Sequence, residues 1–226
     1  MRPRSLVPLI LLVLTPFASA GDQEKTLFAE PFAEKLADGW TWLREDPKGW
    51  RLDKGTLIVR TAVGGIFLKE KGGSLLLRTP PKVKDGKLAV EVLVDIQPTN
   101  GYENAGLIWY YDDDNYVIMV KEKSGNDVVM QFYAEENCKV KAGGHKKHKD
   151  EKPVWVRMEV EGDKISGSYR MSPKDDWITV GQSGLPVRGE AKVGLTTAYA
   201  AKTPEHFTRF NNFRMLQINK RAAGDQ

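Results

Sequence analysis

The sequence contains one cysteine, Cys138, so no disulfide can form within the chain. Net charge is also small, because 34 Lys and Arg residues against 30 Asp and Glu residues give +4 at pH 7. This balance provides no electrostatic basis for binding nucleic acid. Nucleophile elbows, zinc-binding helix motifs and phosphate-binding loops are absent from the sequence as well. The fold must therefore depend on its hydrophobic core alone, and no familiar catalytic motif indicates a function.

Long apolar runs are missing except near the start of the chain. Arg2 and Arg4 precede an apolar stretch at residues 6–17, and Ala18-Ser19-Ala20 follows, which is typical of a cleaved signal peptide. The stretch is shorter than the ~20 residues needed to span a bilayer. We therefore expect residues 1–20 to be removed on export, which leaves a periplasmic or extracellular protein of net charge +2 and no transmembrane segment.

Alternation of apolar and polar residues with a period of two dominates the remaining sequence. It is clearest at residues 88–96 and 154–160, and each pattern predicts a half-buried strand. Two apolar and aromatic runs flank the polar residues 112–115, which predicts a hairpin within residues 105–120. The chain is thus predicted to be all-β, with one sandwich domain over residues 21–219. Further strands are expected at 57–60, 74–77, 128–133, 164–169, 177–180, 192–199 and 206–218.

Segments without this alternation are expected to be irregular. Residues 30–36 could form a short helical turn limited by Pro31. Six lysines and two adjacent glycines at residues 139–152 predict a mobile, protease-sensitive loop. The small and polar residues 220–226 predict a flexible tail.

Short aromatic motifs follow one another along nearly the whole mature chain. They begin with FAEPF at 28–32 and GWTWLRED at 39–46, continue through 105–116, and close with FTRFNNF at 207–213. This order resembles that of concanavalin A-like sandwich domains. The closer resemblance is to the unknown-function family labelled "regulation of enolase" and to the C-terminal module of family 43 xylosidases. It implies a jelly-roll sandwich of two antiparallel sheets and no agreed activity.

Acidic residues on the predicted strands do not form the catalytic patterns of laminarinase-like enzymes, Glu-x-Asp-x-x-Glu or Glu-x-Asp-x-Glu. Glu91 and Asp95 share a strand face, but four strand steps separate them by ~13 Å. Glycosidase pairs lie ~5–9.5 Å apart. Glu159 and Glu161 would have an acceptable spacing of ~7 Å, yet outward acids beside a turn are usually solvated.

A second resemblance keeps an enzyme as the alternative. Asp38-Gly39-Trp40 is similar to the opening motif of secreted 3-keto-disaccharide hydrolases, which implies a sugar hydrolase on the same fold. Asn104-Ala105-Gly106 departs from the Asn-Ser-Gly strand of those enzymes. We therefore favour a protein without catalytic activity and assign no catalytic residue.

Two groups of side chains could hold a metal. His145 and His148 lie three residues apart in the lysine-rich segment, but structural zinc sites ordinarily need four ligands. The carboxylates and amide at residues 112–115 offer oxygen ligands suited to calcium. Hairpin turns favour Asp and Asn for backbone reasons alone. No metal or cofactor is predicted, and a structural calcium ion stays the alternative.

Aromatic side chains provide the remaining functional signal. Trp40 and Trp42 are two residues apart, as are Trp109 and Tyr111, so each pair would share one strand face. Aromatic faces beside a carboxylate such as Asp114 suit sugar rings, although aromatics also fill the space between two sheets. We therefore predict a carbohydrate- or partner-binding module with these five residues as its ligand-binding site. A glycoside hydrolase and a structural envelope protein are the alternatives.

Overall fold

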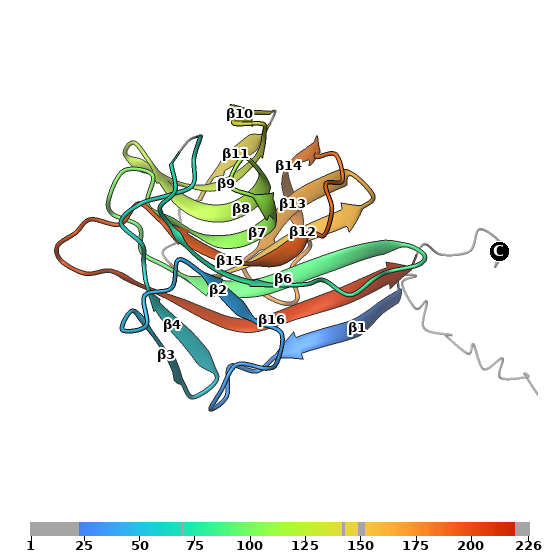
Figure 1. Ribbon diagram of the computed structural model, residues 1–226, viewed down its shortest axis with the longest axis horizontal. Coiled ribbons are helices and arrows are strands. Elements are labelled where there is room, and N and C mark those ends of the chain that lie inside the picture. Colours follow the sequence, from blue (N-terminus) through green and yellow to red (C-terminus); the bar gives the residue numbers. More distant parts are fainter. Residues whose placement is uncertain (1–22, 69, 142, 149–151, 220–226) are drawn as a thin grey trace, which may run out of the picture.

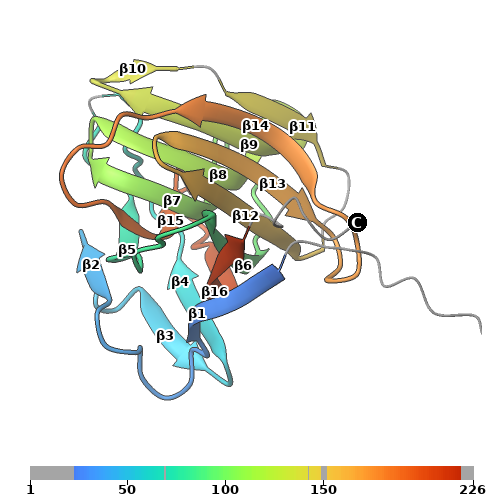
Figure 2. The same ribbon diagram turned by 90° about the vertical axis from the view of Figure 1, so that its right-hand side faces the viewer.

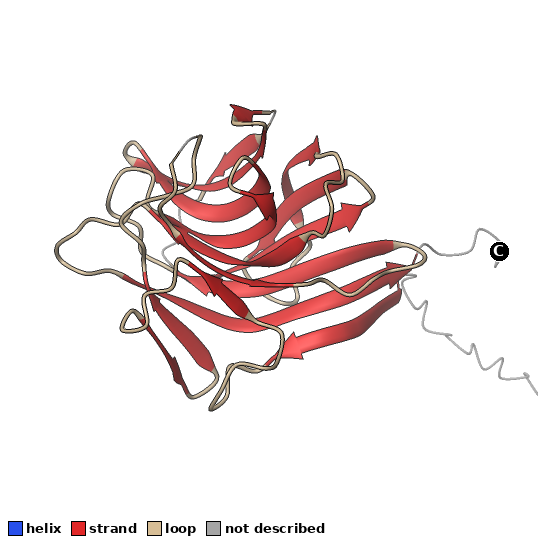
Figure 3. Ribbon diagram, in the orientation of Figure 1, coloured by secondary structure: helices blue, strands red, loops and turns tan. Residues whose placement is uncertain are grey.

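The protein folds as a β-sandwich, and the computed structural model describes residues 23–68, 70–141, 143–148 and 152–219 (Figure 1). The signal peptide expected at 1–20 and the tail expected at 220–226 lie outside these residues. All regular structure within the described residues is strand (Figure 3), and none of it is a helix that could cross a membrane. The all-β prediction is thus confirmed.

The described residues form sixteen strands in two antiparallel sheets, here called sheet A and sheet B. Sheet A runs in the order β14 (Ile178–Gly184), β13 (Lys164–Arg170), β12 (Val154–Glu161), β6 (Lys87–Asp95), β16 (Phe207–Asn219), β4 (Thr56–Arg60) and β3 (Trp50–Asp53), and β1 (Gln23–Glu30) also pairs with β16. Sheet B runs in the order β10 (Lys139–Val140), β9 (Asp127–Glu136), β8 (Asn115–Ser124), β7 (Asn104–Asp112), β15 (Lys192–Ala198), β5 (Ser74–Arg78) and β2 (Thr41–Leu43), and β11 (Gly144–Lys147) also pairs with β9.

The period-two alternation decides which side chains enter the core between the sheets. In β6 the side chains of Val90, Val92 and Val94 are fully buried in the main core, and Glu91 between them lies on the opposite face of the sheet, where it is buried beneath Arg157 and Arg214. The predicted hairpin is confirmed, because β7 and β8 pair through a turn in which Asp112 lies opposite Asn115.

The two edges of the sandwich differ, and this difference creates the candidate site. At one edge β14 lies beside β9 and β11, so the sheets close on each other (Figure 2). Glycines permit the close approach there, because a Cβ added to Gly167 or Gly181 would lie less than 3 Å from the ring of Phe132. At the other edge, β2 ends sheet B and β3 ends sheet A without pairing with each other.

Two segments expected to be irregular or helical have other structures. The mobility and protease sensitivity expected at residues 139–152 stay predictions, and residues 142 and 149–151 lie outside the described residues. Residues 144–147 of the lysine-rich segment form β11, in register with Met130 and its neighbours on β9, because a sheet edge is available for them to pair with. No helical turn forms at residues 30–36. Instead the buried carboxylate of Glu30 accepts hydrogen bonds from the backbone N–H groups of Phe32 and Ala37.

Candidate functional site

The five residues predicted to bind a ligand do not come together at one surface. Trp109 is only 6% exposed and belongs to the main core, where it lies on β7 opposite Val193 of β15 and Val117 of β8. Tyr111, two residues along the same strand face, is half-buried against the same core. These two side chains therefore pack between the sheets.

The other three predicted residues occupy separate places. Trp40 donates a hydrogen bond from Nε1 to Glu30 Oε2 at 2.8 Å and packs edge-on against Phe213. Asp114 is exposed at the β7–β8 turn, where its Oδ1 accepts a hydrogen bond from the Cys138 thiol at 2.8 Å. Of the predicted residues, Trp42 lines a cleft at one edge of the sandwich.

The acidic turn is held together by contacts within the protein. Asp112 Oδ1 accepts hydrogen bonds from the Asp114 backbone N–H and the Asn115 side-chain amide. Asp113 forms an ion pair with Arg44 at 3.0 Å. Among the described residues no group of three or more His, Cys, Asp or Glu side chains is arranged to hold a metal, and this includes the turn and the two histidines of the lysine-rich segment.

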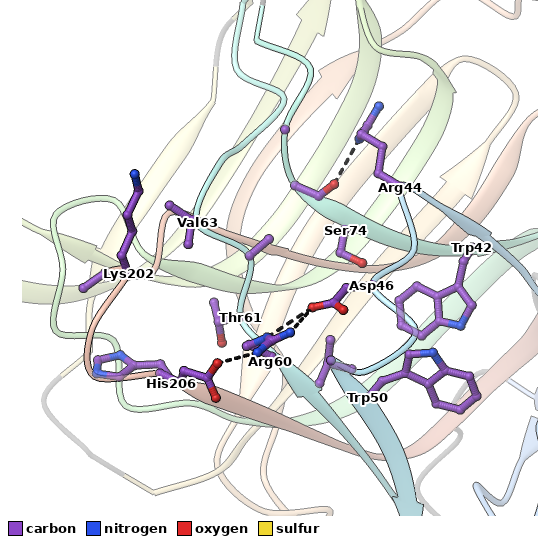
Figure 4. Close-up of a pocket in the computed structure, with 17 residues that line it drawn as sticks. Trp42, Arg44, Asp46, Trp50, Arg60, Thr61, Val63, Ser74, Lys202 and His206 are labelled. Atoms are coloured by element: carbon purple, nitrogen blue, oxygen red, sulfur yellow. Dashed lines mark hydrogen bonds and ion pairs between the residues drawn. The ribbon is translucent and has the colours of Figure 1, made fainter.

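A cleft of about 570 Å³ lies at the open edge of the sandwich (Figure 4). Its walls come from both sheets, with Trp42 on β2 and Trp50 at the start of β3. Its floor includes Arg60 at the end of β4, and the segment from Ala201 to His206 forms the far side. Segments distant in sequence thus meet where the sheets separate, and we call this site the edge cleft.

Two tryptophans form an aromatic wall at one end of the edge cleft. The ring centroids of Trp42 and Trp50 lie 5.5 Å apart, and the ring planes are inclined by 36°. Trp50 Nε1 donates a hydrogen bond to Glu45 Oε1 at 3.0 Å, which fixes its ring. Trp42 Nε1 is buried and has no hydrogen-bond partner among the described residues. The pair offers an apolar face at the edge of a polar site.

Charged groups form the floor beside this wall. The Arg60 guanidinium lies between the carboxylates of Asp46 and Glu205 and forms an ion pair with each of them (Figure 4). The hydrogen bond from Arg60 lowers the pKa of Asp46, so Asp46 is ionised at neutral pH. Two carboxylates and one guanidinium thus present hydrogen-bond acceptors and donors in one row.

A hydrogen-bond network holds the side chain of His206 at the far side of the edge cleft. His206 Nδ1 lies 2.8 Å from Glu103 Oε1, and Glu103 is fully buried. The other oxygen of Glu103 accepts hydrogen bonds from the backbone N–H groups of Thr99 and Asn100. This network positions the imidazole of His206 at the rim.

Sequence reasoning missed most of the edge cleft. Trp50 and Arg60 lie on the paired strands β3 and β4, but Glu205 is 145 positions from Arg60 and Trp42 belongs to the other sheet, so only the fold brings these residues together. Trp50 opens a strand of four residues, too short for its alternation to indicate which face it occupies. In the sequence, the short separation of Trp42 and Trp50 was the one feature that could have indicated this site.

Comparisons with known proteins identify the fold. The model of the β-xylosidase C-terminal concanavalin A-like domain matches residues 29–208. The family 43 protein BlXynB of Bacillus licheniformis is 18% identical with a TM-score of 0.70, and the match covers 84% of this chain and 39% of that one. A xylan β-1,4-xylosidase of Bacillus halodurans is 20% identical with a TM-score of 0.69, covering 88% of this chain and 41% of that one.

A functionally unknown protein from Saccharomyces cerevisiae is 18% identical with a TM-score of 0.65, and the match covers 80% of this chain and 98% of that one. Comparison with curated protein sequences gives no match. The chain spans about two fifths of the length of the two family 43 structures, and nearly the whole length of the yeast one. The match to most of its residues shows that the chain belongs to the family of β-xylosidase C-terminal concanavalin A-like domains.

Proposed function

We propose that this protein is an exported carbohydrate-binding module without catalytic activity, and that it binds a glycan in the edge cleft. The observation that carries the proposal is the combination of an aromatic wall and a row of charged groups in one open site. Trp42 and Trp50 form the wall, and Asp46, Arg60 and Glu205 form the row.

The chemistry of sugars fits this combination. The C–H face of a sugar ring is apolar and packs against an indole, while its hydroxyl groups donate to carboxylates and accept from guanidinium groups. A volume of about 570 Å³ falls within the range of small-ligand sites. The edge cleft is also open to solvent between the two sheets, so a longer chain can extend beyond it.

Catalysis is a less suitable function for the same groups. A glycosidase needs one carboxyl group that stays protonated until it reaches the leaving oxygen. Arg60 instead favours the ionised form of Asp46 and forms an ion pair with Glu205 as well. Both acids are thereby suited to accept hydrogen bonds from a bound sugar.

Calorimetric titration of the mature protein with xylohexaose, cellohexaose and arabinohexaose tests the proposal. Xylohexaose comes first because one similar structure is that of a xylan xylosidase. We expect Trp50→Ala to weaken binding by about 1–3 kcal/mol, taking base–aromatic stacking as a rough guide to the scale. Trp50→Phe should retain part of the affinity.

Tyr102→Ala is the matched control, because Tyr102 is an aromatic residue 66% exposed and outside the edge cleft. This variant should bind as the wild type does. An equal loss of glycan affinity in the Trp50→Ala and Tyr102→Ala variants would contradict binding in the edge cleft. Unaltered affinity of Trp50→Ala would contradict it as well. Release of reducing sugar from any of the three oligosaccharides would contradict the absence of catalysis.

A further inference from the structure

The outer face of sheet A carries a second cluster, well separated in sequence from the edge cleft. Three arginines and two tryptophans stack on one another there, and we call this cluster the arginine–tryptophan ladder. The guanidinium carbon of Arg170 lies 4.2 Å from the ring centroid of Trp177 and 5.9 Å from that of Trp155. Arg157 lies over Trp177 at 5.0 Å, and Arg214 lies over Trp155 at 5.9 Å.

Carboxylates neutralise two of the three arginines. Glu91 is fully buried, and its carboxylate lies 3.2 Å from Arg157 Nη1 and accepts a hydrogen bond from Arg214 Nε at 2.7 Å. Arg157 also contacts Glu24 at 2.8 Å. These pairs account for the charge of Arg157 and Arg214.

Arg170 differs from the other two arginines. Among the described residues no carboxylate forms an ion pair with it, and its buried Nε, like that of Arg157, has no hydrogen-bond partner. Stacking on indoles covers the faces of a guanidinium, and because Nε of Arg170 is buried, its Nη donors are the ones left for a ligand. Such a fork matches the geometry of a carboxylate or a sulfate group. Among the described residues, Arg170 thus has no carboxylate in direct contact, and Glu91 and Glu24 act on it only at longer range.

A groove of about 480 Å³ lies beside the ladder on the same face of sheet A. Glu159 joins the two, because its carboxylate lies 3.3 Å from Arg157 Nε and 3.2 Å from Lys87 Nζ. Ser166, Gln182 and Lys164 also line the groove. Hydroxyl and amide groups suit the hydroxyls of sugars, and the exposed ammonium group of Lys164 suits a further anionic substituent. Lys87 is paired with Glu159, and the carboxylate of Glu161 also lines the groove.

We propose that the ladder and this groove form a second binding surface, which takes an anionic polysaccharide carrying carboxylate or sulfate groups. Arg170 binds one anionic group through its free N–H donors, and the groove holds the neighbouring sugar residues. The aromatic rings and uncharged polar groups favour a polysaccharide over an acidic peptide, whose backbone offers no sugar ring to pack against them. This surface is independent of the glycan bound in the edge cleft.

Titration of the mature protein with four polymers tests the proposal. Dextran sulfate carries sulfate groups, polygalacturonate carries carboxylates, neutral dextran carries neither, and polyglutamate carries carboxylates without sugar rings. We expect one or both anionic polysaccharides to bind and dextran not to bind. Arg170→Gln should weaken that binding about tenfold or more, as expected for the loss of a charge-assisted hydrogen bond.

Arg51→Gln is the matched control, because the Arg51 guanidinium also lies over an aromatic ring, Phe207, at 5.9 Å but outside the ladder. It should leave binding unchanged, and so should Trp50→Ala in the edge cleft. Lys164→Gln, an exposed substitution in the groove, should weaken binding too and provides a second test should Arg170→Gln unfold the protein.

Four results would overturn the proposal. Failure of both anionic polysaccharides to bind would remove the site. Equal losses in the Arg170 and Arg51 variants would indicate attraction by net charge alone. Polyglutamate binding as tightly as polygalacturonate would contradict a polysaccharide ligand. A lower Tm of Arg170→Gln with unchanged affinity would show that the ladder only stabilises the sheet.

Discussion

Tryptophan residues occupy several distinct environments in this protein. Trp109 packs in the core, Trp40 hydrogen-bonds to a buried carboxylate, and Trp42 and Trp50 line the edge cleft. A period of two correctly places Trp109 and Tyr111 on one strand face, because side chains alternate along a strand. It does not reveal whether that face turns inward, since both faces of β7 carry large apolar side chains. Long-range pairing decides this, and no short motif encodes it.

Replacement of Trp109 by Ala should lower the free energy of unfolding by about 3–5 kcal/mol, because it leaves a cavity between the two sheets. Urea denaturation followed by circular dichroism measures this change. Tyr102→Ala, at an exposed position, should change stability by less than about 0.5 kcal/mol. A loss for Trp109→Ala as small as that of the control would show that the indole is not part of the core.

Glu122 should make stability depend on pH in an unusual direction. It lies on β8 with 8% of its surface exposed, and burial raises its pKa from 4.5 to about 7. Because folding raises this pKa, the protonated Glu122 contributes its full stabilisation below pH 4.5. This contribution is lost as the pH rises through 7. At about 1.4 kcal/mol per pKa unit, the loss is at most about 3 kcal/mol.

Glu122→Gln should therefore be more stable than the wild type above pH 7, and the difference should vanish below pH 4.5. Denaturant titrations across this range measure it. Glu190→Gln, at an exposed position, is the control and should follow the wild-type curve. If the difference in free energy of unfolding between the wild type and Glu122→Gln stays constant with pH, Glu122 is not buried as described.

At the scale of strands, the closed edge of the sandwich depends on glycine and a facing phenylalanine. Gly167 on β13 and Gly181 on β14 leave room for the ring of Phe132 on β9. The sequence predicts β13 and most of β9 from their alternation, yet it does not predict that they face each other across the core. It also misses β11, because lysine and glycine have low strand propensity and only the edge of β9 orders them.

Gly167→Ala should destabilise the protein by about 1–3 kcal/mol through overpacking. Its new Cβ would lie 2.5 Å from the Phe132 ring and 2.8 Å from Met119 Sδ. Gly184→Ala is the control, because the nearest atom to its Cβ would lie 3.9 Å away. In a double-mutant cycle, Phe132→Leu should recover part of the loss caused by Gly167→Ala. Additive effects of the two substitutions would contradict the contact.

At the scale of the whole molecule, the resemblance seen in the order of aromatic motifs is confirmed by the family match. Those motifs are readable in sequence because many of their aromatic side chains lie in the core or pack against it, where packing restricts the residue type. The edge cleft is less readable, because Arg60 and Glu205 are 145 positions apart and ordinary as single residues. Sequence patterns thus predict the architecture well and the candidate site poorly.

Export is a further proposal at this scale, because it concerns where the whole chain acts. Arg2, Arg4 and the residues Ala18-Ser19-Ala20 predict cleavage before Gly21. Intact-mass analysis of the protein from the native envelope or medium should show the loss of residues 1–20. Recovery of exported protein that retains Met1 would contradict cleavage, and recovery only from the cytoplasm would contradict export.

Nuclear magnetic resonance of the indole groups tests most directly whether a glycan binds in the edge cleft. The six tryptophans of the chain give six indole N–H signals, each assignable by substitution. On titration with xylohexaose, we expect the signals of Trp42 and Trp50 to shift and those of Trp109, Trp155 and Trp177 to stay in place. Signals of Trp42 and Trp50 that stay in place throughout the titration would contradict binding in the edge cleft.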